Sequence, residues 1–158
     1  MKKVMLILFL LLINVSQSIA CFGTELIIGY DERDSKSYYV ASLLELYIKE
    51  KTGIDTKLIP LNSNKLNLIS EEKVDLIVYP VKDTKGLTKA NLVNRGEETF
   101  FYRTKIKEDL RFSTLEETLK RLSSKLTKDD LLQLFSLIEK KGKTKKTIKE
   151  FLTERSIW

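Results

Sequence analysis

From residue 25 onward, short apolar runs alternate with longer segments in which apolar residues recur at helical spacing. The run Glu25–Gly29 predicts a buried strand. The segment 35–53 then predicts an amphipathic helix that Gly53 ends, because its apolar residues share one face: Val40, Leu43, Leu44 and Tyr47. Together the strand and the helix indicate a β-α unit.

The same alternation continues along the chain. The segment 55–60 predicts a second strand, and Asn62-Ser63-Asn64 opens a short helix that carries Leu66 and Ile69. The run Val74–Pro80, "VDLIVYP", predicts a third strand that Tyr79-Pro80 ends. Strands separated by helices favour right-handed crossovers, so the expected class is α/β, with a mainly parallel sheet and helices on both faces.

The next stretch, residues 81–98, is polar and lacks sustained periodicity, and it predicts no element. Thr99–Arg103 has the aromatic content of a further strand, and the remainder is helical. Two pairs at capping-box spacing predict helix starts, Ser113 with Glu116 and Thr127 with Asp130. The inward-facing residues expected in the last two helices are Leu131, Leu134, Phe135, Ile138, Ile148, Phe151 and Leu152.

The N-terminal segment has the pattern of a secretory signal. Lys2 and Lys3 precede the run Val4–Val15, which is apolar except for Asn14 and too short to span a bilayer comfortably, and small residues place the cleavage site before Cys21. Residues 1–20 are therefore expected to be removed, leaving one domain over 21–158. Cys21 is the only cysteine, and "SIAC" resembles the lipobox of bacterial lipoproteins, so Cys21 is either a lipid anchor or a lone thiol after ordinary cleavage. Mass spectrometry of the exported N-terminus distinguishes the two.

Charge places few constraints on partners. The formal net charge of +6 falls to +4 without Lys2 and Lys3, and an exported protein meets little nucleic acid. The lysines of the segment 139–150 form either a solvated helix-turn-helix surface or a patch that lies on anionic lipid headgroups.

Several signatures of common catalytic sites are absent from the sequence. It has no histidine and no glycine-rich phosphate loop, so nucleophilic triads, zinc sites and resident cofactors are not expected, and the chain is predicted not to be an enzyme. The acidic residues Asp31, Glu32 and Asp34 fit no calcium loop, and they are predicted to form a solvated loop.

Tyrosines follow the predicted strand ends. Tyr30 comes after the first strand and Tyr79 after the third, while Tyr38 and Tyr39 open the first helix. Because ligands bind at the carboxyl ends of parallel strands, and because tyrosine faces attract quaternary ammonium groups, Tyr30, Tyr38 and Tyr79 are the predicted ligand-binding residues. The alternative is that Tyr38 and Tyr39 are half-buried helix residues and that Tyr79 ends a strand with its hydroxyl in water.

Three pieces of the sequence, in this order, resemble the glycine betaine/proline-binding proteins of ABC importers. They are the opening β-α unit with Tyr38-Tyr39-Val40-Ala41, the strand that ends in Tyr79-Pro80, and the C-terminal helices, and the resemblance covers most of 25–80 and 99–153. That family has two lobes with the type 2 periplasmic binding fold. The resemblance implies a single lobe here, with residues 82–98 bridging the place of the absent second lobe. The family's Tyr-Pro-Glu-Tyr reads Tyr79-Pro80-Val81-Lys82, which places a cation beside the site.

The resemblance implies an exported substrate-binding subunit of an ABC importer for glycine betaine or a related quaternary ammonium or amino-acid-like solute. It would act with the permease, or with a homodimer mate that supplies the second lobe, in the periplasm or at the outer face of the cell membrane. The alternative function is an envelope docking accessory, possessing the lobe but binding no solute. A single lobe leaves one side of a small ligand in solvent, so tight binding by the chain alone is not expected.

Overall fold

The computed structural model describes residues 25–62, 68, 71, 73–80, 85–93, 99–109 and 112–158. The segment 1–20, Cys21, and most of the helix expected after Asn62, including Leu66 and Ile69, lie outside the described residues.

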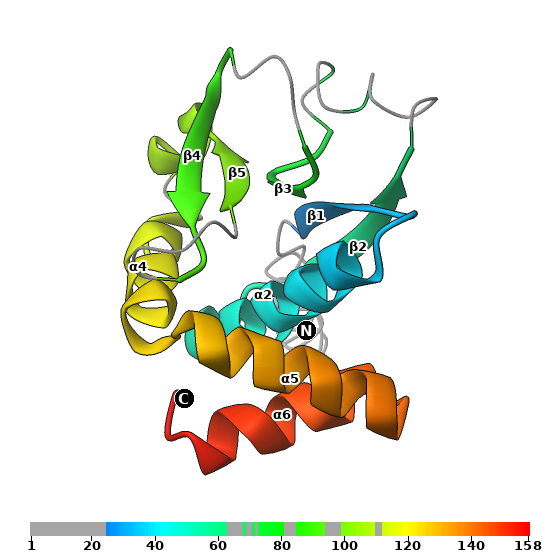
Figure 1. Cartoon of the computed structure of the whole chain (residues 1–158). Coiled ribbons are helices and arrows are strands. Elements are labelled where there is room, and N and C mark those ends of the chain that lie inside the picture. Colours follow the sequence, from blue (N-terminus) through cyan, green and yellow to red (C-terminus); the bar gives the residue numbers. More distant parts are fainter. Residues whose placement is uncertain are drawn as a thin grey trace, which may run out of the picture.

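The centre of the fold is a five-stranded mixed sheet with the order β2-β1-β3-β5-β4 (Figure 1). Its strands are β1 (Leu26–Asp31), β2 (Thr56–Leu61), β3 (Leu76–Val78), β4 (Leu87–Asn91) and β5 (Thr99–Arg103). Strand β1 pairs in parallel with β2 and β3, whereas β5 runs antiparallel to both β3 and β4. The α/β class is confirmed, and the sheet is mixed rather than mainly parallel.

The described helices form layers on one side of this sheet. They are α2 (Ser35–Thr52), α4 (Leu115–Lys125), α5 (Lys128–Lys141) and α6 (Thr144–Glu154), with a short 3-10 turn, η2 (Thr104–Lys107), after β5. Helix α2 packs on β1, β2 and β3 and also contacts α4 and α6, while α5 and α6 lie together beyond it (Figure 1). The described part of the chain therefore forms one small domain.

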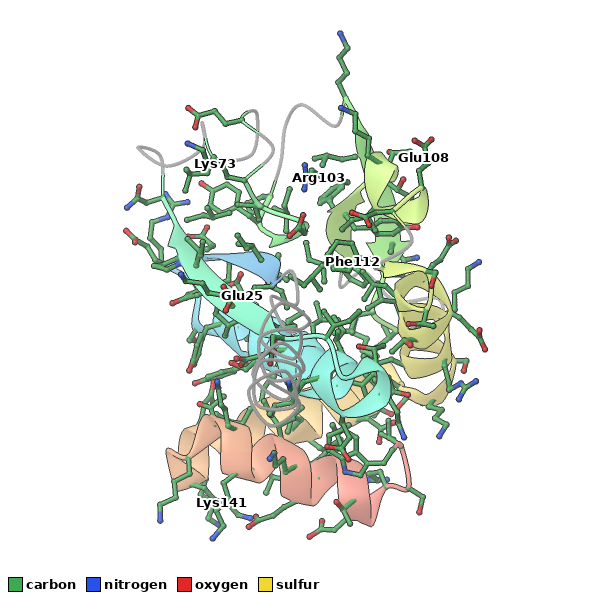
Figure 2. The ribbon with its side chains drawn as sticks, turned by 180° about the vertical axis from the view of Figure 1, so that it is seen from behind. Glu25, Lys73, Arg103, Glu108, Phe112 and Lys141 are labelled. Atoms are coloured by element: carbon green, nitrogen blue, oxygen red, sulfur yellow. The ribbon has the colours of Figure 1, made fainter. Side chains whose placement is uncertain are left out.

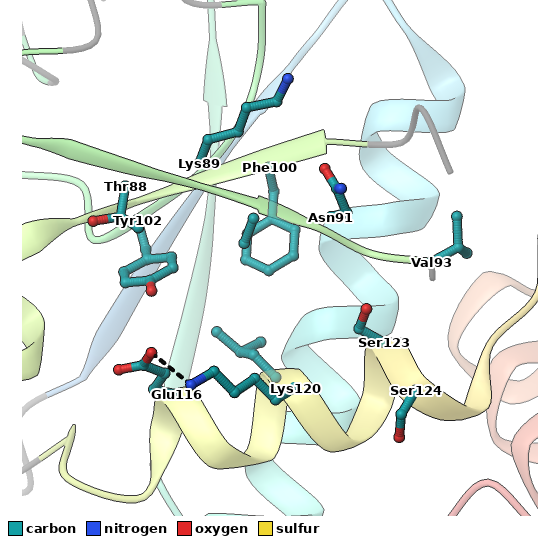
Figure 3. A pocket seen from close by; sticks show the side chains of 12 residues that line it. Thr88, Lys89, Asn91, Val93, Phe100, Tyr102, Glu116, Lys120, Ser123 and Ser124 are labelled. Atoms are coloured by element: carbon teal, nitrogen blue, oxygen red, sulfur yellow. Dashed lines mark ion pairs between the residues drawn. The ribbon is translucent and has the colours of Figure 1, made fainter. Parts of the chain in front are cut away.

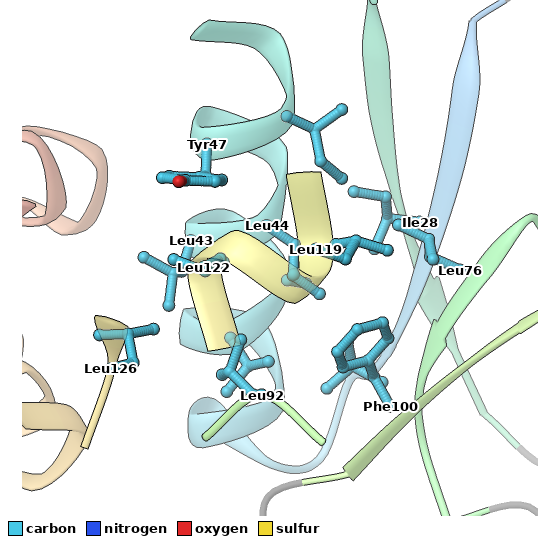
Figure 4. Close-up of a cluster of buried hydrophobic side chains, with 14 of the residues drawn as sticks. Ile28, Leu43, Leu44, Tyr47, Leu76, Leu92, Phe100, Leu119, Leu122 and Leu126 are labelled. Carbon is cyan, nitrogen blue, oxygen red and sulfur yellow. The ribbon is translucent and has the colours of Figure 1, made fainter. Parts of the chain in front are cut away.

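Strand alternation divides the apolar residues between the two faces of the sheet. Leu26, Ile28, Leu76 and Phe100 point into the main core with the inner faces of the helices (Figure 4). A smaller cluster of Leu61, Val74 and Ile77 occupies the opposite face, where the helical residue Leu68 packs against it. All eleven helix-face residues predicted from the sequence are buried: Val40, Leu43, Leu44, Tyr47, Leu131, Leu134, Phe135, Ile138, Ile148, Phe151 and Leu152.

A glycine inside β1 permits close packing on this second face. A methyl group added at Gly29 would lie 2.5 Å from Leu61 Cδ1 and 2.9 Å from Val74 Cγ1. Any larger residue would therefore displace the β2 side chain that covers β1.

The helix ends follow the expected signals with one exception. Gly53 ends α2 with a positive φ, and Thr127 and Asp130 form a capping box at the start of α5, as predicted. Helix α4 instead begins at Leu115, and its N-cap, Thr114, has helical φ and ψ and makes no side-chain capping bond. The predicted capping box of Ser113 and Glu116 is wrong, because the chain enters α4 directly from a preceding turn.

The six lysines of the segment 139–150 are all exposed, and Lys141 lies at the outer end of the helical layer (Figure 2). Lys141 pairs with Glu150 at 3.0 Å, and Lys145 pairs with Glu45 of α2 at 2.8 Å. This surface is thus partly neutralised by its own acidic residues.

Candidate functional site

The first turn of α2 stands at the carboxyl ends of β1 and β3, where parallel strands place ligands. Asp34 is the N-cap of α2, and its carboxylate accepts the backbone N–H groups of Lys36 and Ser37. Because Asp34 already occupies these donors, the helix N-terminus offers few free N–H groups to an anion.

Ser37 joins the three elements that meet here. Its Oγ accepts the backbone N–H of Asp31 at 2.8 Å and donates to the backbone carbonyl of Val78. The side chain is buried, so both bonds are shielded from water. Ser37 thereby fixes the first turn of α2 against the ends of both strands, which sets the position of its neighbour Tyr38.

Two of the three predicted ligand-binding tyrosines come together at this edge. The rings of Tyr30 and Tyr38 lie 5.2 Å apart between centroids at an interplanar angle of 56°, and both side chains are half-buried. Burial raises the pKa of Tyr30 above its usual value, and the neighbouring Tyr38 and Glu32 act in the same direction. The ring of Tyr39 lies 6.3 Å from that of Tyr38 on one side and 5.9 Å from that of Phe135 of α5 on the other. Tyr30, Tyr38 and Tyr39 therefore form a row of neighbouring rings that leads from the strand edge to α5.

The third predicted tyrosine, Tyr79, lies on the other face of the sheet. Strand register pairs Tyr30 with Val78, so the next residue points the opposite way, and Tyr79 packs with the smaller apolar cluster. Its hydroxyl accepts a hydrogen bond from Arg33 at 3.1 Å, and the Arg33 guanidinium lies 6.0 Å from its ring centroid. The Arg33 guanidinium therefore already contacts the Tyr79 ring, which the sequence analysis predicted to bind a ligand cation.

Arg33 also neutralises the buried acid at the end of β1. It donates from Nε and from a terminal nitrogen to the two oxygens of Asp31, at 3.1 and 3.0 Å. Asp31 is 6% exposed, so the prediction of a solvated acidic loop is wrong for this residue, although Glu32 and Asp34 are exposed. Hydrogen bonds from Arg33 hold the pKa of Asp31 below its usual value, against the effect of burial.

This pair predicts a specific pH dependence. A lowered pKa in the folded state contributes stability above the unfolded-state pKa, about 4, and that contribution is lost as the pH falls through the folded-state value. The difference in unfolding free energy between the wild type and Arg33→Gln should therefore be present at about pH 7 and narrow below about pH 4. Urea denaturation across this range measures it, with the exposed Lys36→Gln as the matched control. A difference independent of pH would contradict the coupling.

A groove lined by described residues lies elsewhere, between the β4–β5 pair and α4. It has a volume of about 550 Å³, with Phe100 and Tyr102 on the sheet side and Glu116, Lys120 and Ser123 on the helix side (Figure 3). Sequence analysis missed this groove because it predicted no strand within 81–98, where the structure has β4. The only signal available was the short mixed run at 87–91, which has no clear alternation.

Neither a metal site nor a membrane span is found in the described part of the chain. No cluster of three acidic, histidine or cysteine side chains there could hold a metal ion, and no helix there combines the length and apolar character needed to cross a bilayer. No protein family model matches the chain, and no curated protein or solved structure shows significant similarity to it.

Proposed function

We propose that this chain is an exported, single-lobe solute-binding subunit of an ABC importer. The Tyr30–Tyr38 pair contributes one wall of a site for a quaternary ammonium solute such as glycine betaine. The observation that carries the proposal is the contact of these two half-buried rings at the carboxyl edge of β1, beside the first turn of α2. Aromatic faces at this position attract cations through the ring quadrupole.

The proposed site needs a second surface. Both rings are only half-buried in this chain, and burial on both sides is what strengthens a cation–aromatic contact. The permease of the importer, or a homodimer mate, would supply the opposing wall. Export by the segment 1–20 and a lipid anchor at Cys21 would hold the module in the periplasm or at the outer face of the cell membrane, close to that partner.

A second candidate function is an envelope docking accessory that binds no solute. The position of Tyr79 favours it, because the ring lies on the opposite face from the Tyr30–Tyr38 pair and already contacts Arg33. A cage of three rings around one ligand does not form from these positions. On this account the rim packs α2 against the strand ends and captures no solute.

Calorimetric titration of glycine betaine, choline and proline separates the two functions. The solute-binding function predicts weak binding by the chain alone and tighter binding when the permease is present. Tyr38→Ala should then weaken binding about fivefold or more, the effect of losing one cation–aromatic contact of about 1 kcal/mol. Tyr79→Ala is the control and should have little effect. If no solute binds in either setting while the chain still associates with the permease, the docking function is correct.

A further inference from the structure

Strand β4 forms one edge of the sheet. Among the strands of the described residues its only neighbour is β5, and its residues Leu87 to Asn91 are partly or fully exposed. The opposite edge, β2, contains Pro60, which has no backbone N–H to donate. Strand β4 contains no proline, so its outer edge keeps a complete set of backbone donors and acceptors.

The register identifies which backbone groups of β4 face outward. The N–H of Thr104 donates to the carbonyl of Gly86 at 3.0 Å, which makes these two residues a hydrogen-bonded pair. Such pairs alternate along an antiparallel ladder, so Thr88 and Ala90 bond to β5, while the N–H and C=O groups of Leu87, Lys89 and Asn91 point away from it. Within the described residues these three have no other backbone partner.

The groove described above runs beside this free edge. Thr88 and Ala90 of β4 line it together with Phe100 and Tyr102 of β5, and α4 forms its other wall (Figure 3). The charged residues that line the groove are Lys89 and the pair Glu116 and Lys120, whose side chains lie 3.0 Å apart. The Lys89 side chain points away from α4 in Figure 3 and pairs with no acidic residue among the described ones. The space between β4 and α4 therefore suits uncharged side chains.

We propose that β4 binds an extended segment of a partner protein by strand addition. The segment bonds to the outward N–H and C=O groups of Leu87, Lys89 and Asn91 and so becomes a sixth strand. Since side chains alternate along a strand, an acidic residue opposite Lys89 places its two neighbours on the groove side, between β4 and α4. The partner sequence is thus a small aliphatic residue, an acidic residue and a second small aliphatic residue.

Charge distinguishes this partner from a second copy of the chain. Two β4 strands that pair antiparallel about their centre would bring Lys89 opposite the Lys89 of the other copy, and like charges directly opposite destabilise a ladder. Lysine on an edge strand commonly prevents such self-pairing. An acidic segment removes the repulsion and uses the same charge for recognition.

A fluorescent peptide with the core Val-Glu-Val, flanked by Thr and Ser residues and blocked at both ends, tests the proposal against its Val-Lys-Val counterpart. The full chain should bind the Val-Glu-Val peptide more tightly than the Val-Lys-Val peptide. In the Lys89→Glu variant the preference should be reversed, with the affinity changing by about two- to fivefold for each charge exchanged in the peptide or the protein. Nuclear magnetic resonance should show slower amide exchange at Leu87, Lys89 and Asn91 when the Val-Glu-Val peptide is bound.

A proline substitution separates backbone pairing from charge alone. Lys89→Pro removes an outward N–H without removing a bond to β5, so it should abolish peptide binding while near-UV circular dichroism stays unchanged. Lys89→Gln keeps the N–H and should retain part of the binding. The proposal is overturned if neither peptide binds up to about 1 mM, if Lys89→Glu leaves the preference unchanged, or if sedimentation shows a dimer that Lys89→Pro dissociates.

Discussion

Replacing Asp75 with alanine is expected to lower the free energy of unfolding by about 3 kcal/mol. Asp75 is 7% exposed, and its carboxylate accepts the backbone N–H of Ile27 at 2.9 Å and pairs with Arg103 of β5. Its backbone also donates to Ile27 and accepts from Arg103, so this one residue joins β1, β3 and β5. Alanine would leave a partly buried guanidinium without its carboxylate, and would leave a strand N–H without an acceptor.

The matched control is Asp55→Ala. Asp55 likewise forms an ion pair, in this case with Lys49, but both side chains are more than half exposed. Loss of the Asp55 carboxylate should therefore lower the free energy of unfolding by less than about 1 kcal/mol. Urea denaturation of the two variants beside the wild type gives the comparison. If both variants lost the same free energy of unfolding, the buried Asp75–Arg103 pair would stabilise the fold no more than an exposed ion pair does. Asp75→Asn should lie between wild type and alanine, because the amide oxygen can still accept from Ile27.

The helices could be predicted from the sequence because their signals are local. Gly53 ends α2 and Thr127 starts α5, as the chain around them specifies, and the apolar faces follow from the spacing of residues within each helix. Thr99–Arg103 could be predicted as a strand because its aromatic residues favour a partly buried sheet position. Each of these features depends on a few consecutive residues.

The pairing of the sheet could not be predicted in the same way. Strand β4 reads Leu-Thr-Lys-Ala-Asn, and as an edge strand it needs no buried face of its own, so its sequence lacks the alternation of an inner strand. The direction of β5 depends on its pairing with β3 and β4 rather than on its own residues. A parallel sheet was therefore predicted where the structure has a mixed one.

The tyrosine site was predicted in part for a similar reason. Tyr30 and Tyr38 meet because the end of β1 and the first turn of α2 are joined by three residues, so their proximity is nearly a local property. Placing Tyr79 with them required the register of β3 against β1. In that register Val78, and not Tyr79, is opposite Tyr30, and one residue reverses the face on which a side chain lies.

Ser37→Ala tests how the Tyr30–Tyr38 edge is held, and it is expected to lower the free energy of unfolding by about 2–3 kcal/mol. The variant removes the acceptor of the Asp31 N–H and the donor to the Val78 carbonyl, and both of those residues are buried. Neither group can turn to water without moving α2 away from the strand ends. Ser35→Ala is the control, because Ser35 is exposed at the start of the same helix turn and should change stability by less than about 0.5 kcal/mol.

The same variant separates stability from the arrangement of the rings. If Ser37 positions Tyr38, loosening of the first turn should change the chemical shifts of the Tyr30 and Tyr38 ring protons while those of Tyr47, buried further along α2, stay in place. Shifts unchanged at all three rings, with the full loss of stability, would show that Tyr38 is held by its contact with Tyr30 and not by the serine. In that case the ring pair forms by its own packing, and Ser37 contributes only to the attachment of α2 to the sheet.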